Sequence, residues 1–145
     1  MELEGQSSVH KKVKRVLKEL KKIAINDSKR YEEYVYDYEA DLSKFIKPIM
    51  SKFGLTVEVD VDMVKVQIVK NAENEDNTMA YVCFLLCDEN GFIKIPIQVG
   101  EPCKGDQDKA YRDVLVFARQ YFYNLMFIFP VEKELEGEGH RRPNS

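Results

Sequence analysis

Two apolar stretches joined by a short polar turn constrain the fold of this 145-residue chain more than any other feature. The first, MAYVCFLLC at residues 79–87, is apolar on both faces, and the second, FIKIPIQV at residues 92–99, alternates apolar and polar side chains. The intervening DENG supplies Asn90-Gly91, a dipeptide typical of hairpin turns. We therefore predict an antiparallel hairpin whose first strand is central in a sheet. Pro96 cannot donate a ladder hydrogen bond, so the second strand is predicted at a sheet edge.

The segment before this hairpin predicts further strands with one solvated face. LTVEVDVD, residues 55–62, alternates strictly between apolar side chains and Thr, Glu or Asp. The alternation shifts phase at Met63 and continues at Val64, Val66 and Ile68, which predicts a bulge or a tight hairpin. The polar segment NAENEDNT, residues 71–78, is predicted to be a loop and the most mobile part of the domain.

Two N-terminal segments, residues 8–25 and 39–53, have the three-and-four spacing of helices that bury one face. The second helix is predicted to begin at Glu39 or Asp41 and to stop at Gly54. Between the helices, NDSKRYEE breaks the pattern, and YVYDY is predicted to be extended. An extended chain would place Tyr34, Tyr36 and Tyr38 on one face, where we interpret them mainly as packing residues rather than as base-stacking residues.

A long third helix is predicted at residues 108–127, capped by Asp106 or Asp108. Its predicted buried side chains are Ala110, Tyr111, Val114, Leu115, Ala118, Tyr121, Phe122 and Leu125. A polar stripe on the same helix carries Lys109, Arg112, Arg119 and Tyr123. Arginine suits phosphate because its planar fork makes two parallel hydrogen bonds, and an aromatic side chain beside it can stack on a base. Arginines are common on the surface of long helices, so the stripe alone is a weak indication of nucleic-acid binding.

Charge is distributed unevenly along the chain, whose formal net charge is -3. Residues 1–30 carry nine Lys or Arg against four acids, so the remaining residues carry -8. Lys11, Lys14, Lys18 and Lys21 lie opposite the apolar face of the first helix, as an ordinary solvated surface or as a stripe that faces phosphates. A basic arm on an acidic body can meet nucleic acid, a membrane surface or the acidic face of another copy.

Few residues could support catalysis or hold a cofactor. The two histidines lie near the termini, the three cysteines have no paired spacing and are expected to be reduced, and no Gly-rich phosphate loop is present. Glu58, Asp60 and Asp62 share a strand face, as in a metal-dependent nuclease, but strand alternation alone produces such a face. We therefore predict a protein that is not an enzyme and uses no metal or cofactor.

The length suits one domain, which we predict at residues 1–131, with a basic helix in residues 1–30. From Glu132 the chain has no apolar pattern, and residues 132–145 are predicted to be disordered. We see no secretory signal and no apolar run near the roughly 20 residues of a membrane span. The cytoplasm is therefore the expected location.

YVYDYEADLSKFIKPIMSKFGLTVEV leads from an aromatic-rich stretch into a helix and a K-x-G-L strand entry, and DKAYRDVLVFARQYFYNLMFI contains A-R-x-Y. Together these segments resemble the ERF family of phage single-strand annealing proteins, whose signature helix reads like G-S-A-[IL]-T-Y-A-R-R-Y-[AS]-L. The likeness covers about residues 31–131 in the same order. Arg119 and Tyr121 match the family pattern. The departures from it are Arg112 for its glycine, Val116 for its threonine, Phe117 for its first tyrosine and Gln120 for its second arginine.

The resemblance implies ATP-independent binding of single-stranded DNA and annealing of complementary strands in homologous recombination. It further implies a ring or filament of identical subunits in the cytoplasm of a bacterial host, with a single-strand-binding protein or an exonuclease as partner. The implied fold is α+β, a curved antiparallel sheet of three to five strands packed on the long C-terminal helix, with two N-terminal helices.

On this model a basic trough runs along the last long helix and the adjoining sheet. Its phosphate-binding residues are Lys109, Arg112 and Arg119, with Lys65, Lys70 and Lys94 from the sheet and Tyr123 beside them. The alternative is a non-catalytic protein-interaction or oligomerisation module, of phage or plasmid origin, that has lost its DNA affinity. A metal-dependent nuclease is a more distant third.

Overall fold

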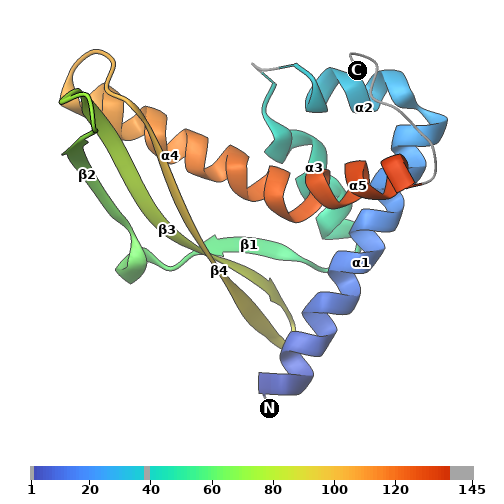
Figure 1. Ribbon diagram of the computed structural model, residues 1–145. Coiled ribbons are helices and arrows are strands. Elements are labelled where there is room, and N and C mark those ends of the chain that lie inside the picture. The colour runs from blue at the N-terminus through green and yellow to red at the C-terminus, as the bar shows by residue number, and fades with distance from the viewer. Residues whose placement is uncertain (1, 38–39, 138–145) are drawn as a thin grey trace.

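The computed structural model describes residues 2–37 and 40–137, which form an α+β fold with an antiparallel sheet packed against helices (Figure 1). The predicted fold class is confirmed: the sheet has four strands, a long helix is C-terminal, and the two predicted N-terminal helices are present, with a short helix between them. The elements are α1 (Glu2–Asn26), α2 (Ser28–Val35), α3 (Leu42–Lys52), β1 (Thr56–Val59), the 3-10 helix η1 (Val61–Met63), β2 (Lys65–Lys70), β3 (Asp76–Asp88), β4 (Gly91–Pro102), α4 (Gln107–Tyr123), the π-helical segment η2 (Asn124–Ile128) and α5 (Phe129–Gly137).

Strand β3 is the centre of the sheet, as its two apolar faces predict. One edge of β3 pairs with β4 from Asn77↔Pro102 to Asp88↔Gly91. Its other edge is shared by β1 and β2, which lie end to end along it. The phase shift at Met63 is therefore a bulge-like interruption occupied by η1, and not a hairpin between β1 and β2.

The β3–β4 turn is held by a side chain that accepts hydrogen bonds from the backbone, and the loop before β3 differs in length from the prediction. In the β3–β4 turn, Asp88 Oδ1 accepts hydrogen bonds from the backbone N–H groups of Asn90 (2.8 Å) and Gly91 (3.0 Å). The turn residues are Glu89 and Asn90, one position earlier than predicted, because Gly91 already pairs with Asp88. The loop between β2 and β3 is shorter than predicted, because β3 begins at Asp76.

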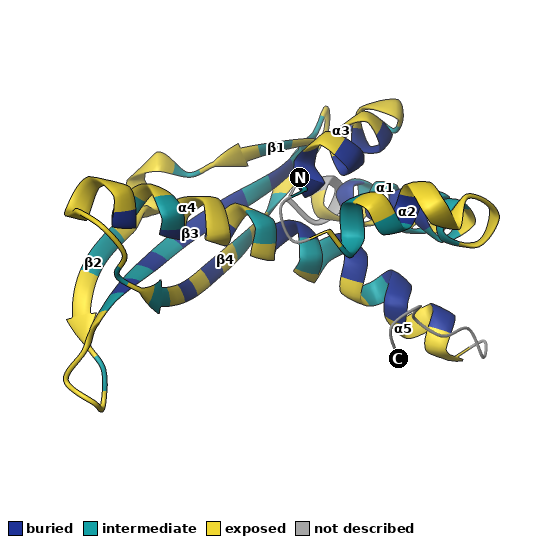
Figure 2. Ribbon diagram, turned by 90° about the horizontal axis from the view of Figure 1, so that it is seen from above, coloured by how far each residue is buried: buried dark blue, intermediate teal, exposed yellow. Residues whose placement is uncertain are grey.

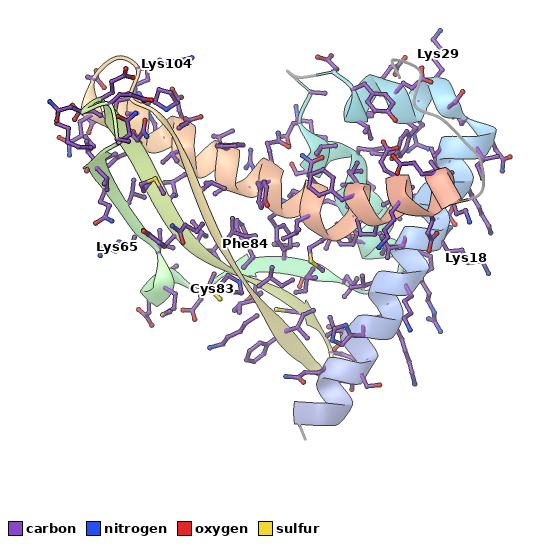
Figure 3. All side chains as sticks on the ribbon, in the orientation of Figure 1. Lys18, Lys29, Lys65, Cys83, Phe84 and Lys104 are labelled. Atoms are coloured by element: carbon purple, nitrogen blue, oxygen red, sulfur yellow. The ribbon has the colours of Figure 1, made fainter. Side chains whose placement is uncertain are left out.

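The core lies between the sheet and the helices. Phe84 points toward α4 and stacks on Phe122 at a centroid distance of 4.5 Å, whereas the neighbouring Cys83 points to the opposite face of the sheet (Figure 3). Helix α4 lies over β3 and β4, and α1 packs mainly against β4. Figure 2 shows the buried residues concentrated along β3 and on the inner sides of the helices.

The prediction that YVYDY is extended is wrong for Tyr34–Tyr36, which form the end of α2 and its C-cap. Only Asp27 interrupts the helical conformation after α1, and α2 carries the chain to Val35, because no glycine or proline stops it. Tyr34 stacks on Phe45 with ring centroids 5.0 Å apart, and the Tyr36 hydroxyl donates to Glu132 Oε1 at 2.7 Å. Both rings are therefore packing residues, as we interpreted them, and Tyr38 lies outside the described residues.

The prediction of disorder from Glu132 onward is wrong for residues 132–137, which belong to α5. Val131 and Leu135, four residues apart, bury one face of α5 in the core. Glu132 is also buried, and it accepts a hydrogen bond from Tyr36. This helical face is short and carries a buried acid, so residues 132–137 show no apolar periodicity. Residues 138–145 lie outside the described part of the chain.

The last long helix is buried differently from the prediction. Leu115, Tyr121 and Leu125 are exposed by 36 to 38%, and Tyr123, which was assigned to the polar stripe, is 1% exposed. Tyr123 is buried because its ring packs against Phe122 and Phe127.

By length and composition alone, the continuous helix Gln107–Gly137 is apolar enough to cross a membrane. A core helix can have the same length and composition, and Phe122 and Phe127 of this helix belong to the core.

Candidate nucleic-acid interface

The three cations predicted on α4 differ in how free they are to meet a phosphate. Lys109 Nζ lies 2.6 Å from Asp113 Oδ2, one helical turn away. Arg119 Nη2 lies 3.8 Å from Asp41 Oδ2, and its side chain is 44% exposed. Arg112 is exposed and makes no ion pair with the described residues. Two of the three guanidinium and ammonium groups are thus partly neutralised by carboxylates of the same chain.

The three lysines predicted on the sheet do not form one surface with the cations of α4. Lys65 is opposite Tyr81 and Lys94 is opposite Leu85, so both lie on the sheet face that points away from α4. Lys94 Nζ is 3.9 Å from Asp60 Oδ2, and Lys70 Nζ is 2.8 Å from Asp76 Oδ1. The predicted trough of cations along α4 and the sheet is therefore not formed.

Tyr123 is not available to stack on a base. Its ring is packed edge-on against Phe122, with centroids 5.2 Å apart, and lies near Phe127. Burial raises the pKa of Tyr123 to about 12, with the charge of Arg119 opposing this effect and the charge of Asp41 adding to it. Tyr123 is a core residue, and its assignment to the interface was wrong.

Gln120, which departs from the resembled family, joins α4 to the start of α3. Its Oε1 accepts a hydrogen bond from the Leu42 N–H (3.3 Å), and its Nε2 lies 3.5 Å from the carbonyl oxygen of Ala40. An arginine at this position could not accept the first of these bonds. The departure at Gln120 therefore has a structural role in this chain.

Asp41 caps the N-terminus of α3 and forms an ion pair with Arg119. Its Oδ1 accepts hydrogen bonds from the N–H (3.0 Å) and the hydroxyl (2.7 Å) of Ser43. Burial acts to raise the pKa of Asp41, but the bonds from Ser43 and the charges of Arg119 and Lys44 outweigh it and lower the pKa. Arg119 thus faces a permanent carboxylate at neutral pH.

An open groove of about 610 Å³ follows the exposed side of α4. Val116, Phe117 and Tyr121 are exposed residues of α4 within it. Burial raises the pKa of Glu101 in this groove, and the charge of Asp113 adds to the effect. The groove is lined by three carboxylates and two lysines, so its net charge does not favour binding of a phosphate backbone. The lining residues are Tyr34, Val35, Asp37, Ala40, Leu42, Glu101, Pro102, Lys104, Lys109, Asp113, Val116, Phe117, Gln120, Tyr121 and Asn124.

Five exposed cations lie together on α1 instead, in what we name the basic stripe: Lys11, Lys14, Arg15, Lys18 and Lys22. All five side chains are exposed, and none forms an ion pair within the described residues. At 3.6 residues per turn they fall within about 100° of one another around the helix. The ion pairs that α1 does make use side chains outside the stripe, namely Lys12, Glu19 and Lys21.

Sequence spacing indicated part of this stripe. Lys11, Lys14 and Lys18 belong to it, whereas Lys21, which was grouped with them, lies 3.8 Å from Glu134. Figure 3 shows Lys18 and Lys29 at the α1–α2 end of the molecule, far from Lys65 and Lys104.

Contacts with the sheet fix the rotation of α1 and therefore the direction of the stripe. Lys12 Nζ lies 3.1 Å from Asp88 Oδ2 and 2.6 Å from Glu89 Oε2, and the Ser8 hydroxyl donates to Asp88 Oδ2 at 2.5 Å. Burial acts to raise the pKa of Asp88, but hydrogen bonds from Ser8, the Asn90 N–H and Lys12 outweigh it and lower the pKa. Val9, Val13, Val16 and Leu20 bury the opposite side of α1, so the basic stripe faces solvent.

Comparisons with protein-family models, with curated proteins and with solved structures return no match to this chain.

Proposed function

We propose that this protein binds single-stranded DNA through the phosphate backbone and pairs complementary strands without ATP or catalysis, with the basic stripe of α1 as the main contact. The observation that carries the proposal is that five exposed cations, unpaired among the described residues, share one face of a helix whose opposite face is buried. The resemblance of α4 and of the α3–β1 segment to annealing proteins supports single-stranded DNA as the ligand. The proposal includes assembly into a ring or filament.

The basic stripe has the dimensions and charge for a backbone contact. From Lys11 to Lys22 it extends about 16 Å along α1, at about 1.5 Å per residue. Each phosphate that a cation neutralises releases condensed counterions, which favours binding at low salt. The net charge of -3 does not oppose this, because five cations that are unpaired among the described residues share one face of α1.

The composition of the stripe suits annealing more than sequence recognition. It contains no aromatic side chain that would stack on bases, so it holds the backbone and leaves the bases free to pair. Arg15 adds a planar donor that can bond to two phosphate oxygens. Binding is therefore expected to depend on strand charge and little on base sequence.

A membrane surface is a poorer ligand for the same stripe. An interfacial helix buries its apolar face in the lipid. In α1 that face is already buried in the protein, with Val9, Val16 and Leu20 at 0% exposure. Only the charges could contact lipid, so a flexible polyphosphate strand is the better match.

The test is fluorescence anisotropy with a labelled single-stranded oligonucleotide of about 20 nucleotides, long enough for several contacts. We expect wild-type protein to bind and to accelerate annealing of a complementary strand, and Lys14→Gln/Lys18→Gln to weaken both. The matched control is Lys47→Gln/Lys104→Gln, which removes the same charge from exposed positions outside α1.

The control variant is expected to bind as the wild type does. Equal losses in the two double variants would show that net charge, not the stripe, sets affinity. Absence of binding to the oligonucleotide at low salt would contradict the proposal itself. Vesicles of anionic phospholipid, added as competitor, should not displace the DNA.

The second candidate function is a protein-interaction module, which the neutralised cations of α4 and the groove with exposed Val116, Phe117 and Tyr121 favour. In that case the basic stripe would be an ordinary solvated surface. The absence of single-stranded DNA binding, with intact folding by circular dichroism, would favour this candidate.

A further inference from the structure

The β1–β2 edge, which we define as Thr56–Lys70, exposes an unusual amount of apolar surface. Figure 2 shows it mostly exposed, with some intermediate residues, beside the more buried β3. Isolated exposed apolar residues are normal, but a run of them along a sheet edge is typical of an interface. The exposed residues are Val59 (41%), Val61 (79%), Met63 (59%), Val64 (37%), Ile68 (41%) and Val69 (41%).

The β1–β2 edge also has one side on which its backbone pairs with no described strand. Strands β1 and β2 pair with β3 on one side only, and no described strand pairs with their other side. The opposite edge of the sheet is β4, which carries Pro96 in its middle and packs against α1. The β1–β2 edge contains neither proline nor glycine. Of the two edges, it is the one open to another chain.

The charged side chains along the β1–β2 edge indicate which kind of partner would fit it. Acids precede η1 or lie within it, at Glu58 and Asp62, and Lys65 follows it. None of these three forms an ion pair within the described residues. An edge that is acidic in its first half and basic in its second is complementary to itself when turned by 180°.

We infer that two copies of this chain associate through their β1–β2 edges about a two-fold axis near Met63 and Val64. Met63 and Val64 of both copies then form the apolar centre. Asp62 of each copy faces Lys65 of the other at the rim, which is the usual arrangement of a protein interface. Because η1 interrupts the strand at the axis, side chains rather than a continuous ladder make the central contact. The inference goes beyond DNA binding and does not depend on it.

The experiment is sedimentation velocity of the full chain without DNA, over a range of protein concentrations. We expect a species of about twice 16.9 kDa for the wild type. Met63→Asp should shift the equilibrium to the monomer and raise the dissociation constant of the dimer at least about tenfold, as for a central interface residue. Phe92→Asp is the matched control, because Phe92 is 49% exposed but lies on β4. It should leave the dimer intact.

Charge reversal tests the two-fold axis without placing a charge in the apolar centre. Asp62→Lys and Lys65→Glu should each weaken the dimer, and the double variant should restore it, because each copy then presents the exchanged pair. A monomeric wild type, equal loss in Phe92→Asp, or failure of the double variant to recover would each overturn the inference. Since no DNA is present, failure of the DNA-binding proposal would not produce these results.

Discussion

Replacement of Tyr123 by phenylalanine should remove a specific loss of stability at alkaline pH. The side chain is 1% exposed and packs against Phe122 and Phe127. Burial raises its pKa from 10.0 to about 12, with smaller and opposing contributions from the charges of Arg119 and Asp41. In the folded protein the phenol therefore keeps its proton at a pH at which the unfolded chain has lost it.

The sign and size follow from linkage. Between pH 10.0 and about 12 Tyr123 loses its proton only in the unfolded state, which this ionisation stabilises. The free energy of unfolding therefore falls as pH rises. A difference of about two pKa units corresponds to about 2.7 kcal/mol at high pH, and to about 1.4 kcal/mol near pH 11. Phenylalanine cannot ionise, so Tyr123→Phe should not show this part of the loss.

Urea unfolding followed by circular dichroism, at about pH 8 and about pH 11, measures the effect. Relative to its own value at the lower pH, Tyr123→Phe should lose about 1.4 kcal/mol less than the wild type. Tyr121→Phe, on the same helix but exposed, is the control and should keep the wild-type loss because Tyr123 is still present. Parallel pH profiles for the wild type and Tyr123→Phe would refute the reasoning.

Three further predictions concern the contacts that hold the helices. Asp88→Asn should destabilise the protein at neutral pH and flatten the decline in stability below pH 3.8. The lowered pKa of Asp88 contributes stability that is lost as the folded carboxylate becomes protonated, and asparagine has no such proton to bind. Thermal unfolding across acidic pH checks this. Phe122→Ala should lower the free energy of unfolding by about 3–5 kcal/mol, since it empties a fully buried site stacked on Phe84; a loss below about 1 kcal/mol in urea unfolding would contradict the packing. Glu132→Ala should lower the free energy of unfolding by about 1–3 kcal/mol because it removes the acceptor for the Tyr36 hydroxyl. Glu132→Gln retains an acceptor and should lower it less. Equal losses of stability in the two variants would show that this hydrogen bond contributes nothing.

Elements that bury one regular face could be predicted from the sequence, because burial selects the spacing of apolar residues. The central position of β3 followed from its two apolar faces, and Pro96 placed β4 at an edge. Helix α3 was delimited by Asp41, whose carboxylate caps it, and by Gly54, whose φ of 78° favours glycine.

The missed elements are short helices whose stability comes from tertiary packing. In α2 only Tyr31 is buried, so the segment has no apolar periodicity of its own. In α5 the buried Glu132 reads as polar although it accepts a hydrogen bond from Tyr36, 96 residues earlier in the chain. A single sequence does not reveal such distant partners.

The same limit explains the errors at the candidate site. Counting along an ideal helix placed Tyr123 beside Arg119 on a polar stripe, but Tyr123 is 1% exposed and packs against Phe122 and Phe127. The neutralisation of Arg119 by Asp41 joins residues 78 positions apart, which helical spacing cannot indicate. The α1 stripe was partly visible because its spacing is local. Its freedom from ion pairs became clear only once the positions of Asp88, Glu89 and Glu134 were known.

The salt dependence of single-stranded DNA binding tests the central claim most directly. Five contacts at the basic stripe predict that the logarithm of the binding constant falls with the logarithm of salt concentration with a slope of about -3.5, at about -0.7 per phosphate. Lys14→Gln/Lys18→Gln should reduce the slope to about -2.1, and Lys47→Gln/Lys104→Gln should leave it unchanged. An unchanged slope in the stripe variant would contradict the account, because the cations of α1 would then make no contact with the strand.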